Sequence, residues 1–130
     1  MWRNDESTIS RAAALAGALA DPGRVRILCS LRPGERCVCQ VVELLGLAPS
    51  TISRHLVVLR EAGLILGRRE GKWMHYRLPG DDAPAAVRRA LEWLFSTVDR
   101  SPEARADAAR MRRIVREDPA ELCCRRRECA

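Results

Sequence analysis

Five of the six cysteines in this 130-residue chain fall into two short groups. Cys37 and Cys39 are separated by a single valine, and Cys123, Cys124 and Cys129 lie together near the end of the chain, beside a run of arginines. Thiolates are the ligands that soft, thiophilic metals and metalloids prefer, and neighbouring arginines favour the ionised sulfur. Both groups are therefore candidate metal- or metalloid-binding sites.

The sixth cysteine, Cys29, stands alone between Leu28 and Ser30, and we interpret it as a small core residue. The chain has no C-x-x-C motif and no histidine beside a cysteine with an orienting carboxylate, which argues against a thiol oxidoreductase. We therefore predict a binding protein and not an enzyme. In a reducing compartment these cysteines are expected to be ligands, redox switches or core thiols and not structural disulfides.

A second set of polar side chains could contact DNA. Hydroxyl and basic residues cluster over 50–55, where a helix is predicted to begin, and further basic residues flank a Glu-Gly turn. Arg54 suits paired hydrogen bonds to guanine, while hydroxyls at a helix N-terminus and a basic turn suit phosphates. The candidate DNA-binding residues are Ser50, Thr51, Ser53, Arg54, His55, Arg68, Arg69 and Lys72.

The hydrophobic pattern predicts the elements that position these side chains. Helical spacing and period-two alternation predict helices over 7–20, 22–31, 38–45, 49–62 and 85–99, and strands over 64–69 and 72–78. The expected fold class is mainly α with a small β-hairpin, a winged helix-turn-helix in the order ααααββα. Residues 1–100 are expected to form this domain, and residues 101–130 a cysteine-containing, partly helical C-terminal tail.

The helix predicted over 49–62 has two different faces. Ile52, Leu56 and Leu59 recur at helical spacing and form its expected buried stripe. A second stripe of Thr51, Arg54, His55 and Val58 is expected to face outward. This division leaves the N-terminal half of the helix free to enter a DNA groove.

Composition agrees with a small DNA-binding domain. Apolar residues make up 47% of the chain, enough for one modest core, and the net charge of +6 favours a polyanionic partner. The longest apolar run, residues 12–20, is too short to span a bilayer, and the acidic residues near the N-terminus argue against a signal peptide. We therefore expect a cytoplasmic protein.

Four segments together resemble one known family. They are ALADPGRVRILCSL, CVCQVVELLGL, STISRHLVVLREAGLI and REGKWMHYRL, in that order over roughly residues 12–99. The chain is thereby similar to the ArsR/SmtB family of metal-responsive repressors, and most similar to its arsenic-sensing ArsR branch. The resemblance implies a homodimer, joined through the first and last core helices, that binds an inverted-repeat operator in double-stranded DNA.

The resemblance also implies the inducer. Such a repressor leaves DNA when As(III), or the similar Sb(III), binds cysteine thiolates spaced C-x-C-x-x-C. Cys37 and Cys39 match this pattern, but Val42 stands at the third position and cannot bind a metalloid. The family's zinc sensors use histidines and carboxylates of the last core helix. Both histidines here, His55 and His75, lie elsewhere, which argues against such a zinc site.

Several ligand sets therefore remain open. In the first, the third ligand is Cys123 or Cys124, from the same or the other subunit. In the second, the tail forms an independent second site. In the third, two thiolates suffice, which would favour a methylated arsenical. On a regular helix, residues 37 and 39 diverge by about 200°, so ligation by both would distort the start of that helix.

The expected function is an arsenic(III)-responsive repressor. The alternatives are a thiolate-based sensor of Cd, Pb or Zn and a thiol redox-switch repressor.

Overall fold

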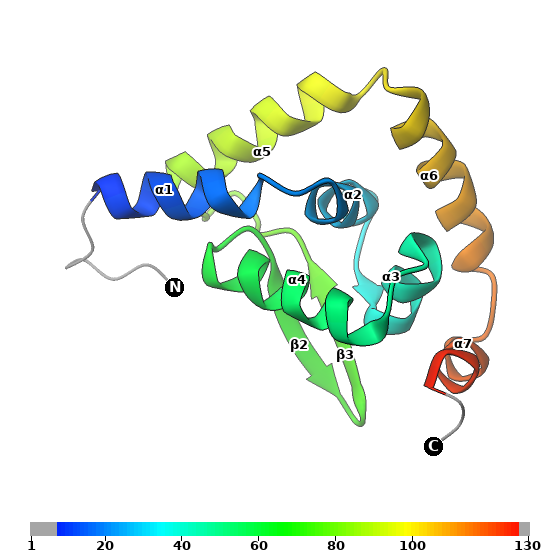
Figure 1. The fold of residues 1–130 in the computed structure, drawn as a ribbon. Helices are drawn as coiled ribbons and strands as arrows, with labels where there is room; N and C mark the ends of the chain where they lie inside the picture. The colour runs from blue at the N-terminus through cyan, green and yellow to red at the C-terminus, as the bar shows by residue number, and fades with distance from the viewer. Residues whose placement is uncertain (1–7, 128–130) are drawn as a thin grey trace.

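A computed structural model describes residues 8–127, and side chains as far as residue 123. Its helices are α1 (Thr8–Ala18), α2 (Pro22–Ser30), α3 (Val38–Leu45), α4 (Pro49–Glu61), α5 (Ala85–Val98), α6 (Pro102–Ile114) and α7 (Pro119–Arg127) (Figure 1). Its strands are β1 (Arg36–Cys37), β2 (Leu66–Glu70) and β3 (Trp73–Arg77). The predicted winged helix-turn-helix fold is confirmed, and β1 is an addition to it.

The turn between α3 and α4 follows from local chemistry. Gly46 ends α3 in the left-handed region, at φ 68°, and its N–H donates to the carbonyl oxygen of Val42 over 2.9 Å. Glycine takes this conformation without a steric penalty. Pro49 then begins α4, as its missing N–H allows at a first helical position. The three apolar residues predicted as the buried stripe of α4 are each at most 2% exposed.

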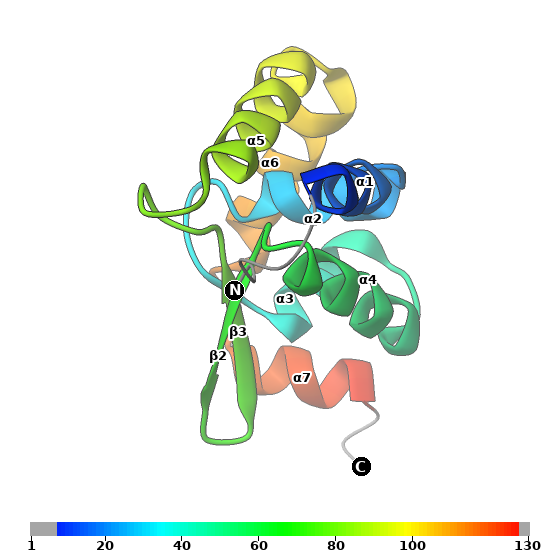
Figure 2. The ribbon, with the colours of Figure 1, turned by 90° about the vertical axis from the view of Figure 1, so that its left-hand side faces the viewer.

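A three-stranded antiparallel sheet forms the wing, with the strand order β1-β3-β2. The hairpin register pairs Leu66 with Arg77 and Glu70 with Trp73, and Cys37 of β1 pairs with His75. Sequence periodicity predicts the hairpin but not β1, because two residues are too few to show alternation. The sheet thereby holds the residues just before α3 against the wing (Figure 2).

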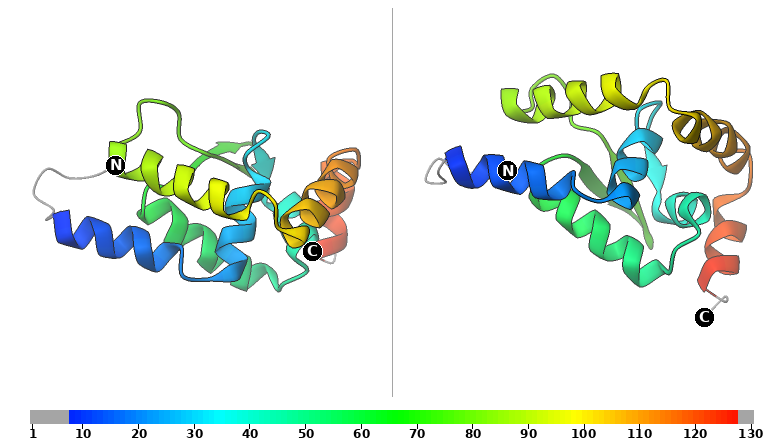
Figure 3. Two further views of the ribbon diagram at one scale, coloured as in Figure 1. Left: turned by 90° about the horizontal axis from the view of Figure 1, so that it is seen from above. Right: turned by 45° about the horizontal axis from the view of Figure 1, so that its top comes forward.

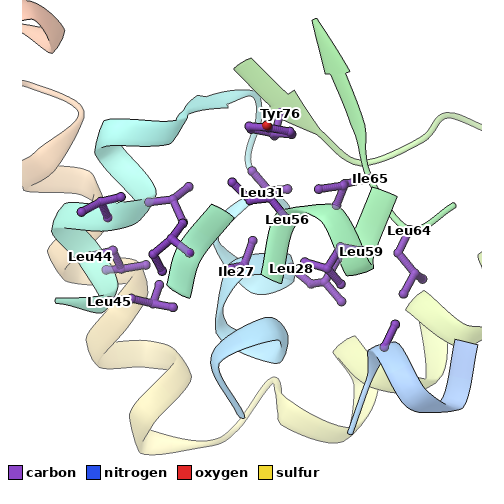
Figure 4. Packing of buried hydrophobic residues seen from close by; sticks show 14 of the residues in the cluster. Ile27, Leu28, Leu31, Leu44, Leu45, Leu56, Leu59, Leu64, Ile65 and Tyr76 are labelled. Carbon is purple, nitrogen blue, oxygen red and sulfur yellow. The ribbon is translucent and has the colours of Figure 1, made fainter. Parts of the chain in front are cut away.

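The core lies between α2, α3, α4 and the start of the hairpin (Figure 4). Aliphatic side chains fill it, as the scarcity of aromatic residues predicts. The fully buried residues include Ile27, Leu28, Leu44, Leu59, Leu64 and Ile65. Burial of each such side chain stabilises the fold by about 1.5–3 kcal/mol relative to exposure, so this core sets the angle between α3 and α4.

The C-terminal segment packs back on the domain. Helix α6 lies on α2 and α3, and α7 lies on α3 (Figures 1 and 3). An ion pair joins α2 to α6, with Arg26 Nε 2.8 Å and its second nitrogen 3.1 Å from the carboxylate oxygens of Asp107. Leu122 of α7 is fully buried. Helices α6 and α7 together cover part of α3.

Helices α1 and α5 leave an apolar face uncovered. They lie along one edge of the molecule (Figure 3), and a groove between them is lined by Ala12, Leu15, Ala16, Ala90 and Trp93. Trp93 is 59% exposed. Among the described residues, no single helix is long and apolar enough to cross a membrane; α3 and α4 meet that test only as a bent pair.

Candidate functional site

Helices α3 and α7 bring together two of the predicted thiol ligands. Cys39 lies in the first turn of α3, and Cys123 lies in α7, 84 residues further along the chain. Their Cα atoms are 5.1 Å apart, and their sulfurs form a disulfide. The expectation that the cysteines form no disulfide is wrong for this pair. We call Cys39 and Cys123 the α3–α7 sulfur pair.

Cys37 lies two residues before Cys39 in the sequence but in a different environment. It is 3% exposed and free, and it stands at the N-cap of α3 with extended backbone. Its N–H donates to Oε1 of Gln40 over 2.9 Å. Because Cys37 precedes the helix, the 200° divergence expected for two helical residues does not describe Cys37 and Cys39. Cys39 faces α7, and Cys37 belongs to the sheet.

The other predicted ligands are placed less completely. Cys124 belongs to α7, but its side chain is outside the described part of the structure, and Cys129 lies outside the described residues altogether. Val42 is 3% exposed in the core. Within residues 8–123, no three histidine, cysteine or acidic side chains are close enough to hold a metal ion. The described part of the site is thus two adjacent sulfurs with a third cysteine close by in sequence.

Cys29 is separate from these groups. It is only half-buried and lines a cavity between α2 and α6 with Ser30, Asp107 and Met111. The prediction that it is a core residue is therefore wrong in detail. Burial raises the pKa of its thiol, and the charge of Arg32 offsets this in part.

Helix α4 presents most of its predicted polar face to solvent. Ser50, Ser53 and Arg54 are exposed, and Thr51 is half-buried. These residues lie in the first two turns, because α4 begins at Pro49. An exposed guanidinium on the N-terminal half of α4, the second helix of the helix-turn-helix, can reach a base edge in the major groove.

His55 departs from the predicted outward stripe. Its side chain is 13% exposed, and its Nε2 lies 3.5 Å from Oδ2 of Asp21. Its Nδ1 lies 3.3 Å from a guanidinium nitrogen of Arg24. The ring therefore faces the start of α2, and the expectation that it faces outward is wrong. Helical spacing places His55 beside Thr51 but cannot show that another helix approaches from that side.

The basic residues of the wing differ in how far their charge is compensated. Arg68 binds both oxygens of Glu35, over 2.8 and 2.7 Å, and an oxygen of Glu70 over 2.6 Å. Hydrogen bonds from Arg68 lower the pKa of both carboxyls, and these carboxylates raise the pKa of Arg68. Arg69 and Lys72 are exposed near the tip. The tip charges are therefore better suited to phosphate contact than Arg68.

Comparison with known proteins finds a family whose model matches part of this chain. The family model described as "Bacterial regulatory protein, arsR family" matches residues 21–65. Over 61 residues the chain is 51% identical to the Arsenic resistance transcriptional regulator ArsR1 of Pseudomonas putida, a match that covers 46% of this chain and 48% of that protein. The chain spans about half the length of the first curated relatives it matches.

Two further matches cover more of the chain. The Biofilm growth-associated repressor of Agrobacterium fabrum is 40% identical over 91 residues, which are 70% of this chain and 74% of that protein. A homodimeric winged helix-turn-helix DNA-binding domain from Mycobacterium bovis, described as a possible ArsR-family transcriptional regulator, superposes with a TM-score of 0.60 at 30% identity. That superposition covers 75% of this chain and 91% of the M. bovis domain.

Proposed function

Because this chain belongs to the ArsR family of bacterial regulatory proteins, we propose that it is a transcriptional repressor released from operator DNA by As(III). The observation that supports As(III) as the inducer is the α3–α7 sulfur pair, in which Cys39 and Cys123 lie within bonding distance of each other. The name of the P. putida relative supports arsenic as the metalloid. Sb(III) and methylated As(III) share the same thiophilic chemistry.

The contacts of α7 support a ligand set for this proposal. Once the disulfide is reduced, Cys39 and Cys123 can bind one arsenic atom from the same subunit. Arsenous acid, As(OH)3, condenses with thiols so that each new As–S bond releases one water. A methylated arsenical needs only these two thiolates. As(III) or Sb(III) takes a third, from Cys124 or from Cys37, and Cys37 would have to move toward the pair to reach it. Cys123 thus takes the role that Val42 cannot fill.

The DNA face of this proposal consists of α4 and the wing. Arg54 is proposed to read guanine in the major groove, while Ser50, Thr51 and Ser53 contact phosphates beside the N-terminus of α4. Arg69 and Lys72 at the wing tip contact the DNA backbone, with Arg68 held by its two carboxylates. Phosphate contacts position the protein, and Arg54 supplies sequence preference.

Helix α3 connects the two faces, because it packs against both α7 and α4. Arsenic bound to Cys39 and Cys123 fixes the distance between α3 and α7, and an additional bond to Cys37 would pull on the residue that caps α3. The turn from α3 to α4 is only three residues long, so movement of α3 is passed to α4. A hundredfold weaker DNA affinity requires about 2.7 kcal/mol of coupling.

The partner in this proposal is a second copy of the chain. The apolar groove between α1 and α5, with exposed Trp93, is the proposed interface, because a two-fold dimer buries the same surface of both subunits. The homodimeric state of the M. bovis domain supports this arrangement. A dimer would place two copies of α4 on two half-sites of an inverted repeat.

The test is release of DNA measured by fluorescence anisotropy. Reduced protein first selects a duplex from random sequence, and the labelled duplex complex is then titrated with arsenite, antimonite, methylarsenite, Cd(II) and Zn(II). Arsenite is expected to release the duplex at concentrations at which Zn(II) does not. Release by Cd(II) or Zn(II), with none by arsenite, would instead favour the metal-sensing alternative.

A redox switch is the second candidate, and the disulfide itself favours it. Peroxide would oxidise the two thiols to the disulfide and be reduced to water. Release of the duplex by peroxide without any metalloid, reversed by a thiol reductant and absent in Cys123→Ser, would support this candidate. Unchanged binding in peroxide would remove it.

A further inference from the structure

His55 lies in a small polar cluster that joins three helices. Its ring, on α4, contacts Asp21 and Arg24 at the start of α2. The Arg24 guanidinium also donates to the carbonyl oxygens of Ala18 over 2.8 Å and Gly17 over 2.9 Å, at the end of α1. Arg24 therefore connects α4 to the last turn of α1.

The backbone at the start of α2 leaves room for this ring. A Cβ at Gly23 would lie 3.1 Å from His55 Nε2 and 3.0 Å from Asp21 Oδ2. The ring and the carboxylate therefore approach the α2 backbone as closely as a glycine permits. A side chain at position 23 would crowd the His55 ring and the Asp21 carboxylate, and both would have to shift.

The donors and acceptors of the cluster determine how the ring bonds. A guanidinium can only donate hydrogen bonds, so Nδ1 of His55 must accept from Arg24. The remaining ring nitrogen then carries its proton toward Asp21. Asp21 also accepts from the N–H of Arg24 over 3.2 Å as the N-cap of α2. Burial tends to raise the pKa of Asp21, but hydrogen bonds from the backbone N–H groups of Arg24 and Gly23, together with the charge of Arg24, outweigh burial and lower the pKa.

We propose that His55 positions the recognition helix and does not itself read a base. The ring bridges Asp21 and Arg24, and so fixes α4 relative to the end of α1. Since α1 borders the proposed dimer groove, the cluster also links subunit packing to the angle of α4. This inference rests on the proposed contact of α4 with DNA.

A set of His55 variants tests the assignment with the selected duplex. His55→Ala removes the bridge, whereas His55→Gln keeps one acceptor for Arg24 and one donor for Asp21. We expect roughly tenfold weaker binding for His55→Ala, as for loss of a hydrogen bond to a charged group, and a loss of less than threefold for His55→Gln. Equal affinities of His55→Ala and wild type, or equal losses in His55→Ala and His55→Gln, would overturn the proposal.

A double-mutant cycle separates positioning from base reading. Asp21→Asn retains an N-cap for α2 but weakens the bridge, so it remains informative if His55→Ala fails to fold. We expect Asp21→Asn alone to weaken duplex binding. The double variant Asp21→Asn with His55→Ala should lose no more affinity than His55→Ala alone. Duplexes with single base changes should rank alike for wild type and His55→Gln. Additive losses, or discrimination lost at one base pair, would assign His55 to base reading instead.

This test is distinct from that of the proposed function. If wild-type protein selects no duplex at all, the DNA-binding proposal fails. If wild type binds and the His55 and Asp21 variants bind equally well, only the positioning role fails.

Discussion

Helices α4 and α7 both lie against α3, but different forces hold them there. Helix α4 buries three aliphatic side chains in the central core, and His55 adds a polar contact to α2. In the part of α7 whose side chains are described, residues 119–123, Leu122 is fully buried and Cys123 is bonded to Cys39. The position of α4 depends on the core, whereas the position of α7 depends on sulfur chemistry.

This difference divides the molecule into a stable part and a responsive part. Changing the oxidation or ligation of two sulfurs alters a main attachment of α7 but removes none of the aliphatic side chains that α4 buries. A ligand at the α3–α7 sulfur pair can therefore act on α3 while the winged helix-turn-helix remains folded.

The largest expected effect is on the core under α4. Leu56→Ala should lower the free energy of unfolding by about 2–5 kcal/mol, because it leaves a cavity between packed helices. Denaturant unfolding followed by circular dichroism measures the change. Val57→Ala, at a position 52% exposed on the same helix, is the matched control and should change stability little.

Removal of the apolar contact of α7 should have a smaller and local effect. Leu122→Ala removes about 2 kcal/mol of burial from α7 and should raise hydrogen exchange in residues 119–127. Exchange in α4 should not change, and neither should duplex affinity in the absence of metalloid. Glu121→Ala, at an exposed neighbouring position, is the control. Loss of protection throughout the domain would mean that α7 is part of the folding core.

The proposed base reader should affect sequence preference. Arg54→Ala is expected to weaken binding to the selected duplex by about 1–3 kcal/mol and to reduce discrimination among single-base variants. Anisotropy with a panel of duplexes measures both quantities, and Arg60→Ala, exposed in the last turn of α4, is the control. Equal weakening for every duplex would assign Arg54 to the backbone.

The wing should show the difference between a free and a compensated charge. Lys72→Ala should reduce the slope of log affinity against log salt by about one, the value expected for one lost phosphate contact. Arg68→Ala should reduce it less, because Glu35 and Glu70 already bind the Arg68 guanidinium. Titrations over a range of salt concentrations measure the slopes; a larger change for Arg68→Ala would reverse the assignment.

The smallest effect concerns the reactivity of Cys29. Burial raises the pKa of this thiol, so its alkylation should be slow at neutral pH and should accelerate only in more alkaline solution than for an unperturbed cysteine. Mass spectrometry of peptides from reduced, iodoacetamide-treated protein gives the rate at each pH. A fast reaction at neutral pH would show that the α2–α6 cavity does not protect the thiol.

Local sequence signals predict the DNA side of the molecule better than the thiol side. Helical spacing correctly identifies Ile52, Leu56 and Leu59 as buried, and Gly46 marks the end of α3 because few other residues adopt its backbone conformation. The contact of Cys39 with Cys123 joins residues far apart in sequence, so no local pattern contains it.

Long-range contacts also explain the other differences. The inward turn of His55 depends on Arg24 and on the absence of a side chain at Gly23, both on another helix. The pairing of Arg68 with Glu35 depends on the fold of the wing, although Glu70, two residues along the same strand, is visible as a partner from spacing alone. The sequence predicts which residues are polar and basic there, but not which of their charges remain uncompensated.

The central claim is that the metalloid acts through the α3–α7 sulfur pair. Its most direct test is the arsenite concentration that releases half of the selected duplex, measured for reduced wild type, Cys39→Ser, Cys123→Ser and Cys29→Ser. We expect at least a tenfold higher concentration for Cys39→Ser and Cys123→Ser, about 1.4 kcal/mol, with Cys29→Ser like wild type. If Cys123→Ser released the duplex at the same arsenite concentration as wild type, this claim would be contradicted.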